Sequence, residues 1–300
     1  MSDPFRFVIC PPYHGATALA FLLNNHPRLS CLGDTLPWTA QNQSCSCGSR
    51  VEDCAFWQEI QRRVHASRWQ GEQQMLPLLP RLVGAPRLNR ALARALVAAS
   101  LVFGHSARRL APRPVTEFCE VYQDFYDSVL ELHGTEHVVD GSKSLGKILA
   151  LTGLGEPGQR ARVLHLTRDP RGYAASLANR GVAPADIGAV GSEWRRTHRR
   201  IERLLSRPRQ FDYLRIRYED LCQTPDRTMG QVLRFFGVEP VDVFHPAREP
   251  CKNHIIGNRM LKSFDGVLRL DERWRTVLGA GQQDAVLARA APLAADYGYR

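Results

Sequence analysis

Lysine is scarce in this sequence: four of the 40 basic residues are lysine, and the others are arginine. Long apolar runs are missing too, since no stretch approaches the roughly 20 apolar residues that cross a bilayer. The chain does not open with a basic segment followed by an apolar run, so no secretory signal peptide is recognisable. We therefore expect a cytoplasmic protein without a transmembrane segment, and mostly reduced thiols among its eight cysteines.

The composition is that of a folded protein with an anionic partner. Hydrophobic residues make up 44% of the 300 residues and charged residues 23%, which excludes wholesale disorder. No internal repeat indicates a solenoid or a propeller. The net charge of +10 favours nucleic acid, acidic lipid or a phosphorylated small molecule as partner. No nucleic-acid-binding module is recognisable, so we expect no nucleic-acid partner.

Short apolar segments alternate with helical segments along the chain. Residues 5–10 (FRFVIC) predict a buried strand, a turn with Gly15 follows, and residues 16–25 carry a helical leucine stripe. The same alternation predicts strands at 137–140, 162–167 and 213–217. It predicts a helix that follows the strand 137–140 and ends at Leu151, and further helices over 170–179 and 225–236. This order predicts an α/β fold with a central, mostly parallel sheet flanked by helices, in a single domain over residues 1–300.

Two segments interrupt the alternation. Residues 41–58 are rich in Cys and Ser and predict a loop. Residues 65–115 hold several prolines around a basic helical stretch, and we interpret them as a helical insertion outside the sheet that could cover the acceptor side of the site. The apolar face of that helix either packs onto the domain or makes peripheral contact with a membrane.

The turn after the first strand could hold a phosphate. A helix that begins after a tight glycine turn presents free backbone N–H groups and the positive end of its dipole. Residues 11–17 (PPYHGAT) lack the GxxxxGK[ST] pattern of nucleoside triphosphatases, which argues against ATP or GTP hydrolysis. Taken alone, the segment is a weak signal and is more typical of an ordinary strand–helix turn.

The stretch VLHLTRDPRGYAAS at 163–176 gives a stronger signal. Arg168 falls at the carboxyl end of a predicted strand, where open parallel sheets bind ligands. Ser176 lies eight residues later on the following helix, so both side chains can converge on one phosphate. The alternative is that Arg168 only forms an ion pair with Asp169 or Asp220.

At this point the chain resembles the sulfotransferases that use 3′-phosphoadenosine 5′-phosphosulfate (PAPS). The resemblance implies a P-loop-kinase-like α/β architecture with a helical insertion. The loop departs from the family pattern, because Tyr13, His14 and Ala16 stand where a basic residue, serine and threonine are usual. The matching stretches are FVICPPYHGATALAFLLNNHP (7–27), CLGDT (31–35), VVDGSKS (138–144), TRDPRGYAAS (167–176), RYEDL (217–221) and HIIGNRMLK (254–262).

The resemblance implies which residues bind the nucleotide. The 5′-phosphate falls to the segment Tyr13, His14, Gly15, Ala16, Thr17 and Ala18. Arg168 and Ser176 would bind the 3′-phosphate, and a loop that contains Gly257, Asn258, Arg259 and Lys262 would close over it. Tyr218 would contact the adenine or the ribose.

The resemblance also implies transfer of a sulfuryl group to a hydroxyl or amine of a carbohydrate, a lipid or a small metabolite. Asp34 is the candidate general base, although it could instead shape a turn. Lys143 and a protonated His14 are candidate donors to the developing negative charge, although Lys143 could simply be solvated. No HExxH or paired-carboxylate motif indicates a catalytic metal. A weakly catalytic protein that binds PAPS or its product 3′-phosphoadenosine 5′-phosphate (PAP) is the alternative, ahead of a nucleic-acid-binding protein.

The cysteines of residues 31–54 leave three possibilities open. Cys31, Cys45, Cys47 and Cys54 lie within 24 positions of one another. They could be free buried thiols, form a disulfide or hold a structural zinc ion. The spacing CxC followed by six residues and Cys lacks the paired CxxC of zinc ribbons.

Overall fold

The computed structural model describes seven stretches of the chain. The insertion expected over 65–115 lies largely outside them, as do the candidate site residues Asp34, Gly257, Asn258, Arg259 and Lys262. The described residues are 5–33, 44–67, 113–154, 160–206, 210–245, 252–256 and 265–300.

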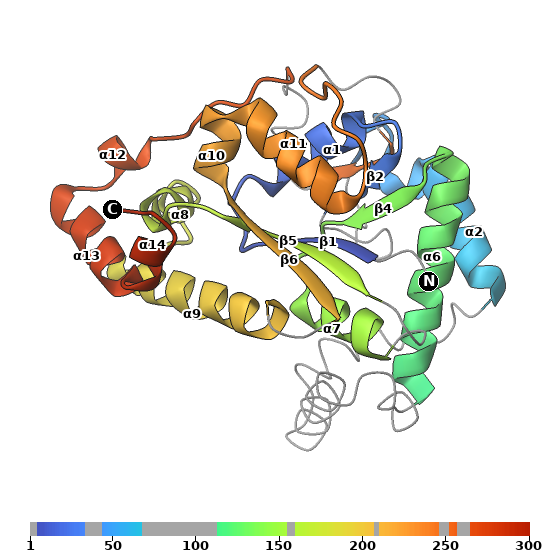
Figure 1. Ribbon diagram of the computed structural model, residues 1–300, viewed down its shortest axis with the longest axis horizontal. Coiled ribbons are helices and arrows are strands. Elements are labelled where there is room, and N and C mark those ends of the chain that lie inside the picture. The colour runs from blue at the N-terminus through green and yellow to red at the C-terminus, as the bar shows by residue number, and fades with distance from the viewer. Residues whose placement is uncertain are drawn as a thin grey trace.

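A five-stranded parallel sheet forms the centre of the structure (Figure 1). The strand order is β2-β4-β1-β5-β6, so the first strand of the chain lies in the middle. A separate two-stranded antiparallel sheet joins β3 to β7. The strands are β1 (Phe5–Ile9), β2 (Leu29–Cys31), β3 (Ser44–Cys45), β4 (His137–Asp140), β5 (Ala161–Thr167), β6 (Phe211–Arg217) and β7 (Ile255–Ile256).

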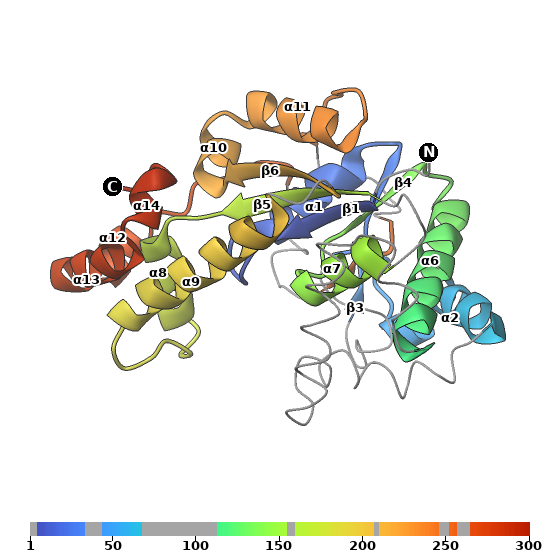
Figure 2. The same ribbon diagram turned by 60° about the horizontal axis from the view of Figure 1, so that its bottom comes forward.

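The central strand β1 is buried because both of its faces are covered. Phe7 and Ile9 belong to one apolar core, and Val8 and Cys10 belong to another on the opposite face. Side chains alternate along a strand, so a strand covered on both sides is a continuous apolar run. Figure 2 shows helices on both sides of the sheet.

Helices form a layer on each face and a third group beyond the carboxyl ends of the strands. One face carries α1 (Ala16–Asn25), α10 (Tyr218–Gln223) and α11 (Pro225–Phe236). The other carries α2 (Ala55–Ser67), α6 (Arg113–His133), α7 (Leu145–Leu154) and α9 (Gly188–Leu205), with a 3₁₀ turn at Val51–Asp53. The third group holds α8 (Pro170–Ala178), α12 (Trp274–Val277), α13 (Ala280–Ala290) and α14 (Leu293–Asp296).

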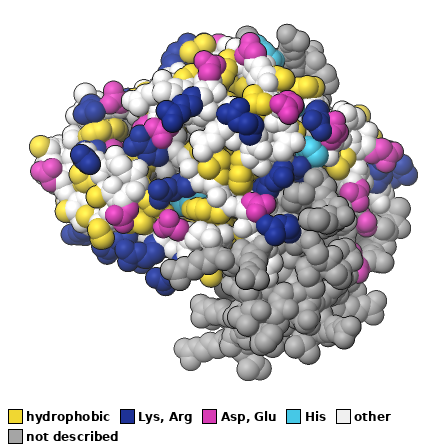
Figure 3. All heavy atoms as spheres, in the orientation of Figure 1, with side chains coloured by type: hydrophobic (Ala, Val, Ile, Leu, Met, Phe, Trp, Pro, Cys, Tyr) yellow, Lys and Arg dark blue, Asp and Glu magenta, His cyan; other side chains and the backbone are white. Residues whose placement is uncertain are grey.

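The predicted alternation of strands and helices is confirmed, with boundaries correct to within a few residues. The expected loop over 41–58 instead contains β3, the 3₁₀ turn and the start of α2. No sequence pattern indicated the other elements that were not predicted, which are β2, β7, α6, α9, α10, α12, α13 and α14. Within the described ranges, no helix combines the length and the apolar character needed to cross a membrane. Figure 3 shows basic side chains spread over the visible face with acidic ones between them.

Close backbone contact fixes α13 against α9. A Cβ atom added at Gly191 of α9 would lie 2.1 Å from the carbonyl oxygen of Val286 in α13. Nearby, the buried Trp194 donates its Nε1–H to the carbonyl of Arg168 at 2.9 Å. The packed pair of α9 and α13 therefore supports the chain just after β5.

We predict that Gly191→Ala destabilises the protein by about 1–3 kcal/mol, because a backbone carbonyl cannot yield to the new methyl group. Gly230→Ala in α11 is the control, since its Cβ would lie 3.4 Å from the flexible end of Arg234. That variant should change stability by less than about 1 kcal/mol. Urea unfolding of both variants checks the prediction, and equal stabilities would contradict the packing described here.

Candidate functional site

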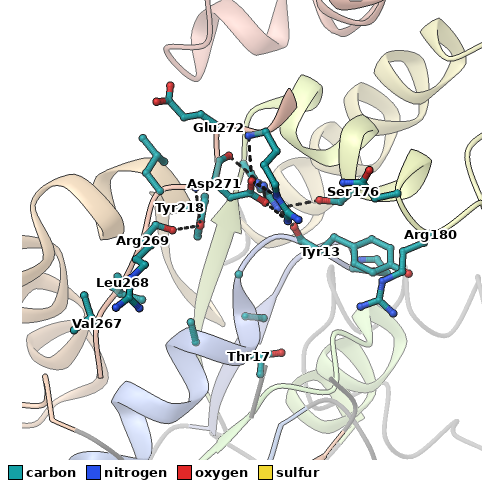
Figure 4. A pocket seen from close by; sticks show the side chains of 18 of the residues that line it. Tyr13, Thr17, Ser176, Arg180, Tyr218, Val267, Leu268, Arg269, Asp271 and Glu272 are labelled. Atoms are coloured by element: carbon teal, nitrogen blue, oxygen red, sulfur yellow. Dashed lines mark hydrogen bonds and ion pairs between the residues drawn. The ribbon is translucent and has the colours of Figure 1, made fainter. Parts of the chain in front are cut away.

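A cavity of about 960 Å³ lies where the chain leaves β1 and β5 (Figure 4). Its walls come from segments far apart in the sequence, including the turn before α1, the segment 168–180 and the segment 265–273. Nine residues predicted from the sequence line it: Tyr13, Gly15, Ala16, Thr17, Ala18, Lys143, Arg168, Ser176 and Tyr218.

The register of two neighbouring strands explains the position of the cavity. Ile9 of β1 pairs with His165 of β5, so both strands end at the same edge of the sheet. After β1 the chain continues toward β2 on one side, and after β5 toward β6 on the other. Ligands of open α/β sheets bind at such a topological switch point.

The start of α1 presents backbone donors to the cavity. Gly15 precedes the helix with φ +89°, a left-handed conformation that suits glycine, and a Cβ there would lie 2.6 Å from the Tyr218 ring. The first helical turn has no acidic residue, and no side chain caps it. The first N–H groups of a helix have no intrahelical acceptor. Ala16, Thr17 and Ala18 are therefore positioned to bind an anion.

Arg168 and Ser176 meet at the opposite wall. Arg168 Nη1 donates to Ser176 Oγ at 3.3 Å and to the carbonyl of Tyr13 at 2.7 Å. Asp169 caps α8 by accepting from the backbone of Arg171, which starts the helix directly after Arg168. The expected convergence of Arg168 and Ser176 is thus present, and a phosphate between them remains a prediction.

The buried Arg168 guanidinium has an acidic partner that the sequence did not indicate. Nη2 donates to Asp271 Oδ2 at 3.0 Å, while Nε has no hydrogen-bond partner among the described residues. Asp271 also accepts from Arg273 at 2.8 Å. The bonds from Arg273, with the charge of Arg168, hold the pKa of Asp271 well below its usual range. The suggested ion pairs of Arg168 with Asp169 or Asp220 are wrong, since those carboxylates pair with Arg171 and Arg217.

Tyr218 connects α10 to the segment 265–273. Its hydroxyl donates to the carbonyl of Arg269 at 2.8 Å and accepts from the backbone of Asp271 at 3.3 Å. Its ring lies 4.9 Å from the guanidinium carbon of Arg168, and burial raises the pKa of its hydroxyl. Tyr218 therefore forms one wall of the cavity beside Gly15 and Arg168.

Two residues of the cavity have left-handed backbones although they are not glycine. Lys143 has φ +57° and Tyr13 has φ +63°. Such conformations carry local strain and occur preferentially at functional sites. Lys143 and Thr17 also line a second cavity of about 10 Å³, shared with Gly33 and His254. Lys143 therefore lies between the large cavity and the residue just before Asp34.

The prediction that a protonated His14 donates to the transferred group is wrong. The ring of His14 is buried away from the large cavity, and burial lowers its pKa to about 3. Nδ1–H donates to the carbonyl of Pro12 at 2.8 Å, which leaves Nε2 as an acceptor. Only the backbone of His14 therefore stays a candidate for phosphate binding.

His14 is the first member of a buried hydrogen-bonded chain. His198 donates from Nε2 to His14 Nε2 at 3.1 Å, and His165 donates from Nε2 to His198 Nδ1 at 2.7 Å. Tyr213 closes the chain by donating its hydroxyl to His165 Nδ1 at 2.5 Å. The carbonyl of Pro12 thus fixes the tautomers of three neutral histidines. Because His14 belongs to the turn before α1, this hydrogen-bonded chain supports that turn.

Sequence reasoning also missed Arg180, Asn179 and the segment 265–273. Arg180 lies at the end of the segment that begins with Arg168, and its guanidinium carbon is 5.5 Å from the Tyr13 ring centre. The only signal in the sequence was a basic residue just after a predicted helix. The segment 265–273 has no periodic pattern, so no signal indicated its place at the cavity.

The comparisons with known proteins agree on the fold and the family. The sequence matches the model of the sulfotransferase family over residues 4–242. The fold is similar to the sulfotransferase domain from the olefin synthase of Synechococcus PCC 7002, with a TM-score of 0.55, 20% identity and coverage of 99% of this chain and 95% of that one. It is also similar to the sulfotransferase domain from the curacin biosynthetic pathway, with a TM-score of 0.54, 16% identity and coverage of 100% and 99%. No curated protein matches the sequence.

We predict that acid destabilises the protein through the histidine chain. Burial is the main cause that lowers the pKa values of His14, His165 and His198 in the folded chain. Below pH 6.5, the usual pKa of histidine, these side chains therefore bind protons in the unfolded chain but stay neutral in the folded chain. Stability is therefore complete above pH 6.5 and falls below it, by up to about 4 kcal/mol per pH unit for three protons.

Urea unfolding between pH 5 and pH 8 measures this dependence, and ¹⁵N imidazole spectra report the tautomers. We expect a neutral His14 with its proton on Nδ1 throughout this range. Ring titration with midpoints near 6.5, together with constant stability, would contradict the buried chain.

Proposed function

The chain belongs to the sulfotransferase family, and from this membership we propose that it transfers a sulfuryl group from PAPS to a hydroxyl or amine of a carbohydrate, a lipid or a small metabolite. One observation carries the proposal. The free N–H groups at the start of α1 and the Arg168–Ser176 pair line the same cavity. Two separate sites for anions in one cavity suit a nucleotide with phosphate groups at both its 3′ and 5′ positions.

The residues of the cavity fit such a nucleotide. Its volume of about 960 Å³ lies in the range of small-molecule and cofactor sites. Five basic residues and three acidic residues line it, which leaves a positive balance for an anionic ligand: Lys143, Arg168, Arg180, Arg269 and Arg273 against Asp265, Asp271 and Glu272. Nε of Arg168 is a buried donor with no partner in the described ranges, and a phosphate oxygen would satisfy it.

The 3′-phosphate would bind to Arg168 and Ser176, a charged donor beside a hydroxyl donor. Asp271 already holds one nitrogen of Arg168, so the phosphate competes with this carboxylate or adds to the other nitrogens. A nucleotide that has a 5′-phosphate but no 3′-phosphate would not bind to Arg168 and Ser176 in this way. We therefore assign the selectivity for PAPS over ATP to Arg168 and Ser176.

The 5′ end would bind to the backbone of residues 14–18 and to the Thr17 hydroxyl. PAPS, when bound, supplies the sulfuryl group that moves in line between two oxygens. The chain supplies fixed donors for the negative charge that develops on the departing oxygen. We assign this role to Lys143, because it lines the cavity together with Thr17 and the start of α1.

The acceptor hydroxyl must lose its proton during transfer, and we assign that proton to Asp34. This residue directly follows Gly33, which lines the small cavity together with Lys143 and Thr17. A carboxylate placed to accept a hydroxyl proton contributes about 10²–10⁴-fold to a rate. His14 cannot take this role, because both of its ring nitrogens are engaged in the buried chain.

The second candidate is a protein of the same family that binds PAPS or PAP but transfers sulfate slowly. The turn before α1 offers no cationic side chain, since Tyr13 replaces the usual basic residue and the pKa of His14 is lowered to about 3 by burial. Release of PAP from PAPS in the presence of a panel of hydroxyl compounds separates the two candidates. An enzyme turns over repeatedly with at least one of them.

We predict that Arg168→Ala weakens PAP binding by roughly 10- to 100-fold, the value of one or two charge-assisted hydrogen bonds. Binding of adenosine 5′-phosphate should change much less, because that nucleotide lacks the 3′-phosphate. Arg171→Ala is the control, since the Arg171 guanidinium pairs with Asp169 at 2.7 Å and does not line the cavity. Equilibrium dialysis measures both affinities, and equal losses for both nucleotides in Arg168→Ala would overturn the 3′ assignment.

We also predict that Asp34→Asn lowers turnover by about 10²–10⁴-fold and leaves PAP affinity within about twofold of the original. Asparagine keeps the size of the side chain and removes its ability to accept a proton. The rate of PAP release with a productive acceptor, and a PAP titration, separate the two effects. Full activity in this variant would assign the base to another residue.

A further inference from the structure

A cluster of three cysteines lies outside the nucleotide cavity. Cys45 ends β3, Cys47 lies in the turn that follows, and Cys54 precedes α2. Their sulfur atoms all lie within 4.8 Å of one another, and Cys31 is not among them. All three are free thiols, so the disulfide that the sequence left open is not present among them.

The distances between the sulfurs fit a tetrahedral metal ion. Cys47 Sγ lies 3.6 Å from Cys54 Sγ, and Cys54 Sγ lies 3.7 Å from Cys45 Sγ. Zinc–sulfur bonds of about 2.3 Å in a tetrahedron place sulfurs about 3.8 Å apart. A disulfide would need about 2.05 Å. We propose that Cys45, Cys47 and Cys54 bind one structural Zn²⁺ ion as thiolates.

The turn around Cys47 directs backbone donors at the sulfurs. The N–H of Cys47 donates to the sulfur of Cys45, and the N–H of Ser49 donates to the sulfur of Cys47. The turn itself is closed by Cys45 N–H to Ser49 at 2.8 Å and Gly48 N–H to Cys45 at 3.0 Å, and Gly48 has φ +95°. Hydrogen bonds from backbone N–H groups stabilise negative charge on sulfur, as thiolate ligands require.

A side-chain donor completes this environment. Asn253 Nδ2 lies 3.6 Å from Cys45 Sγ and 3.5 Å from Cys54 Sγ. Its Oδ1 accepts from His133 Nε2 at 3.2 Å, which fixes the orientation of the amide. Burial lowers the pKa of His133 to about 4, so its ring is neutral at pH 7. Supporting partners of this kind orient metal ligands and adjust their basicity.

The ion would add a link between segments that already meet in one apolar core, which contains Cys45, Cys54 and Ile255. The cluster connects β3 and the start of α2, and Ser46 N–H donates to the carbonyl of His254 at 2.8 Å. His254 in turn lines the small cavity beside Lys143. Two of the three sulfurs are buried, while Cys47 is exposed and gives the ion an entry path. The proposed role is therefore to fix the turn after β3 and the start of α2 to each other, beside the β3–β7 pair.

Metal analysis of the purified full chain tests the proposal. We expect about one zinc ion per chain by plasma mass spectrometry, and background levels in Cys45→Ser, Cys47→Ser and Cys54→Ser. Cys119→Ser is the control, because Cys119 lies in the core between α6 and α7, donates to the carbonyl of Ala150 and belongs to no cluster. It should keep its zinc. Loss of zinc in all four variants, or its retention in the three cluster variants, would overturn the proposal.

A measurement on the unmutated protein covers the case in which a variant does not fold. Replacement of the bound ion by Co²⁺ should produce a near-ultraviolet sulfur-to-cobalt charge-transfer band with the intensity of three thiolates and the visible bands of a tetrahedral site. Absence of the band, or a disulfide found by mass analysis after alkylation, would overturn the site. Neither outcome depends on PAPS binding, so failure here is distinct from failure of the proposed activity.

Discussion

The parallel pairing of β1 with β5 is the constraint on which the site depends. Because Ile9 lies opposite His165, both strands end at one edge, and the chain turns there in opposite directions. The start of α1 and the Arg168 guanidinium consequently face one cavity. A shift of this register by one residue would turn the side chains of one strand to the wrong faces of the sheet. Both apolar cores would then lose their contacts, and the start of α1 would separate from Arg168.

The charge of Arg168 is compensated within the protein, although the cavity as a whole is lined by more basic than acidic residues. Arg168 is buried, and a buried guanidinium needs partners. Asp271 and Ser176 supply some of them, while Nε has none within the part of the chain that the structure describes. An arrangement of this kind keeps the guanidinium in place before a nucleotide arrives. The phosphate proposed for this position would compete with the Asp271 carboxylate, which lowers the affinity for any ligand that binds Arg168 less strongly than Asp271 does.

Local sequence patterns predicted those features of the structure that depend on residues close together in the chain. The apolar run of β1, the glycine turn and the spacing from Arg168 to Ser176 each specify their structure within a few residues. The partners from distant segments could not be predicted in this way. Asp271 comes from an irregular stretch, and the hydrogen-bond partner of the buried His14 ring is His198, 184 positions away. The close approach of the sulfurs at residues 45–54 likewise depends on a turn that CxC spacing alone does not reveal.

A calorimetric titration of the unmutated protein with PAP, and separately with ATP, tests the central claim most directly. The structure has one cavity that joins the start of α1 to Arg168 and Ser176. If this cavity binds the nucleotide, PAP should bind one to one and at least about tenfold more tightly than ATP, a difference of about 1.4 kcal/mol. Equal or tighter binding of ATP, or no binding of PAP, would contradict the account.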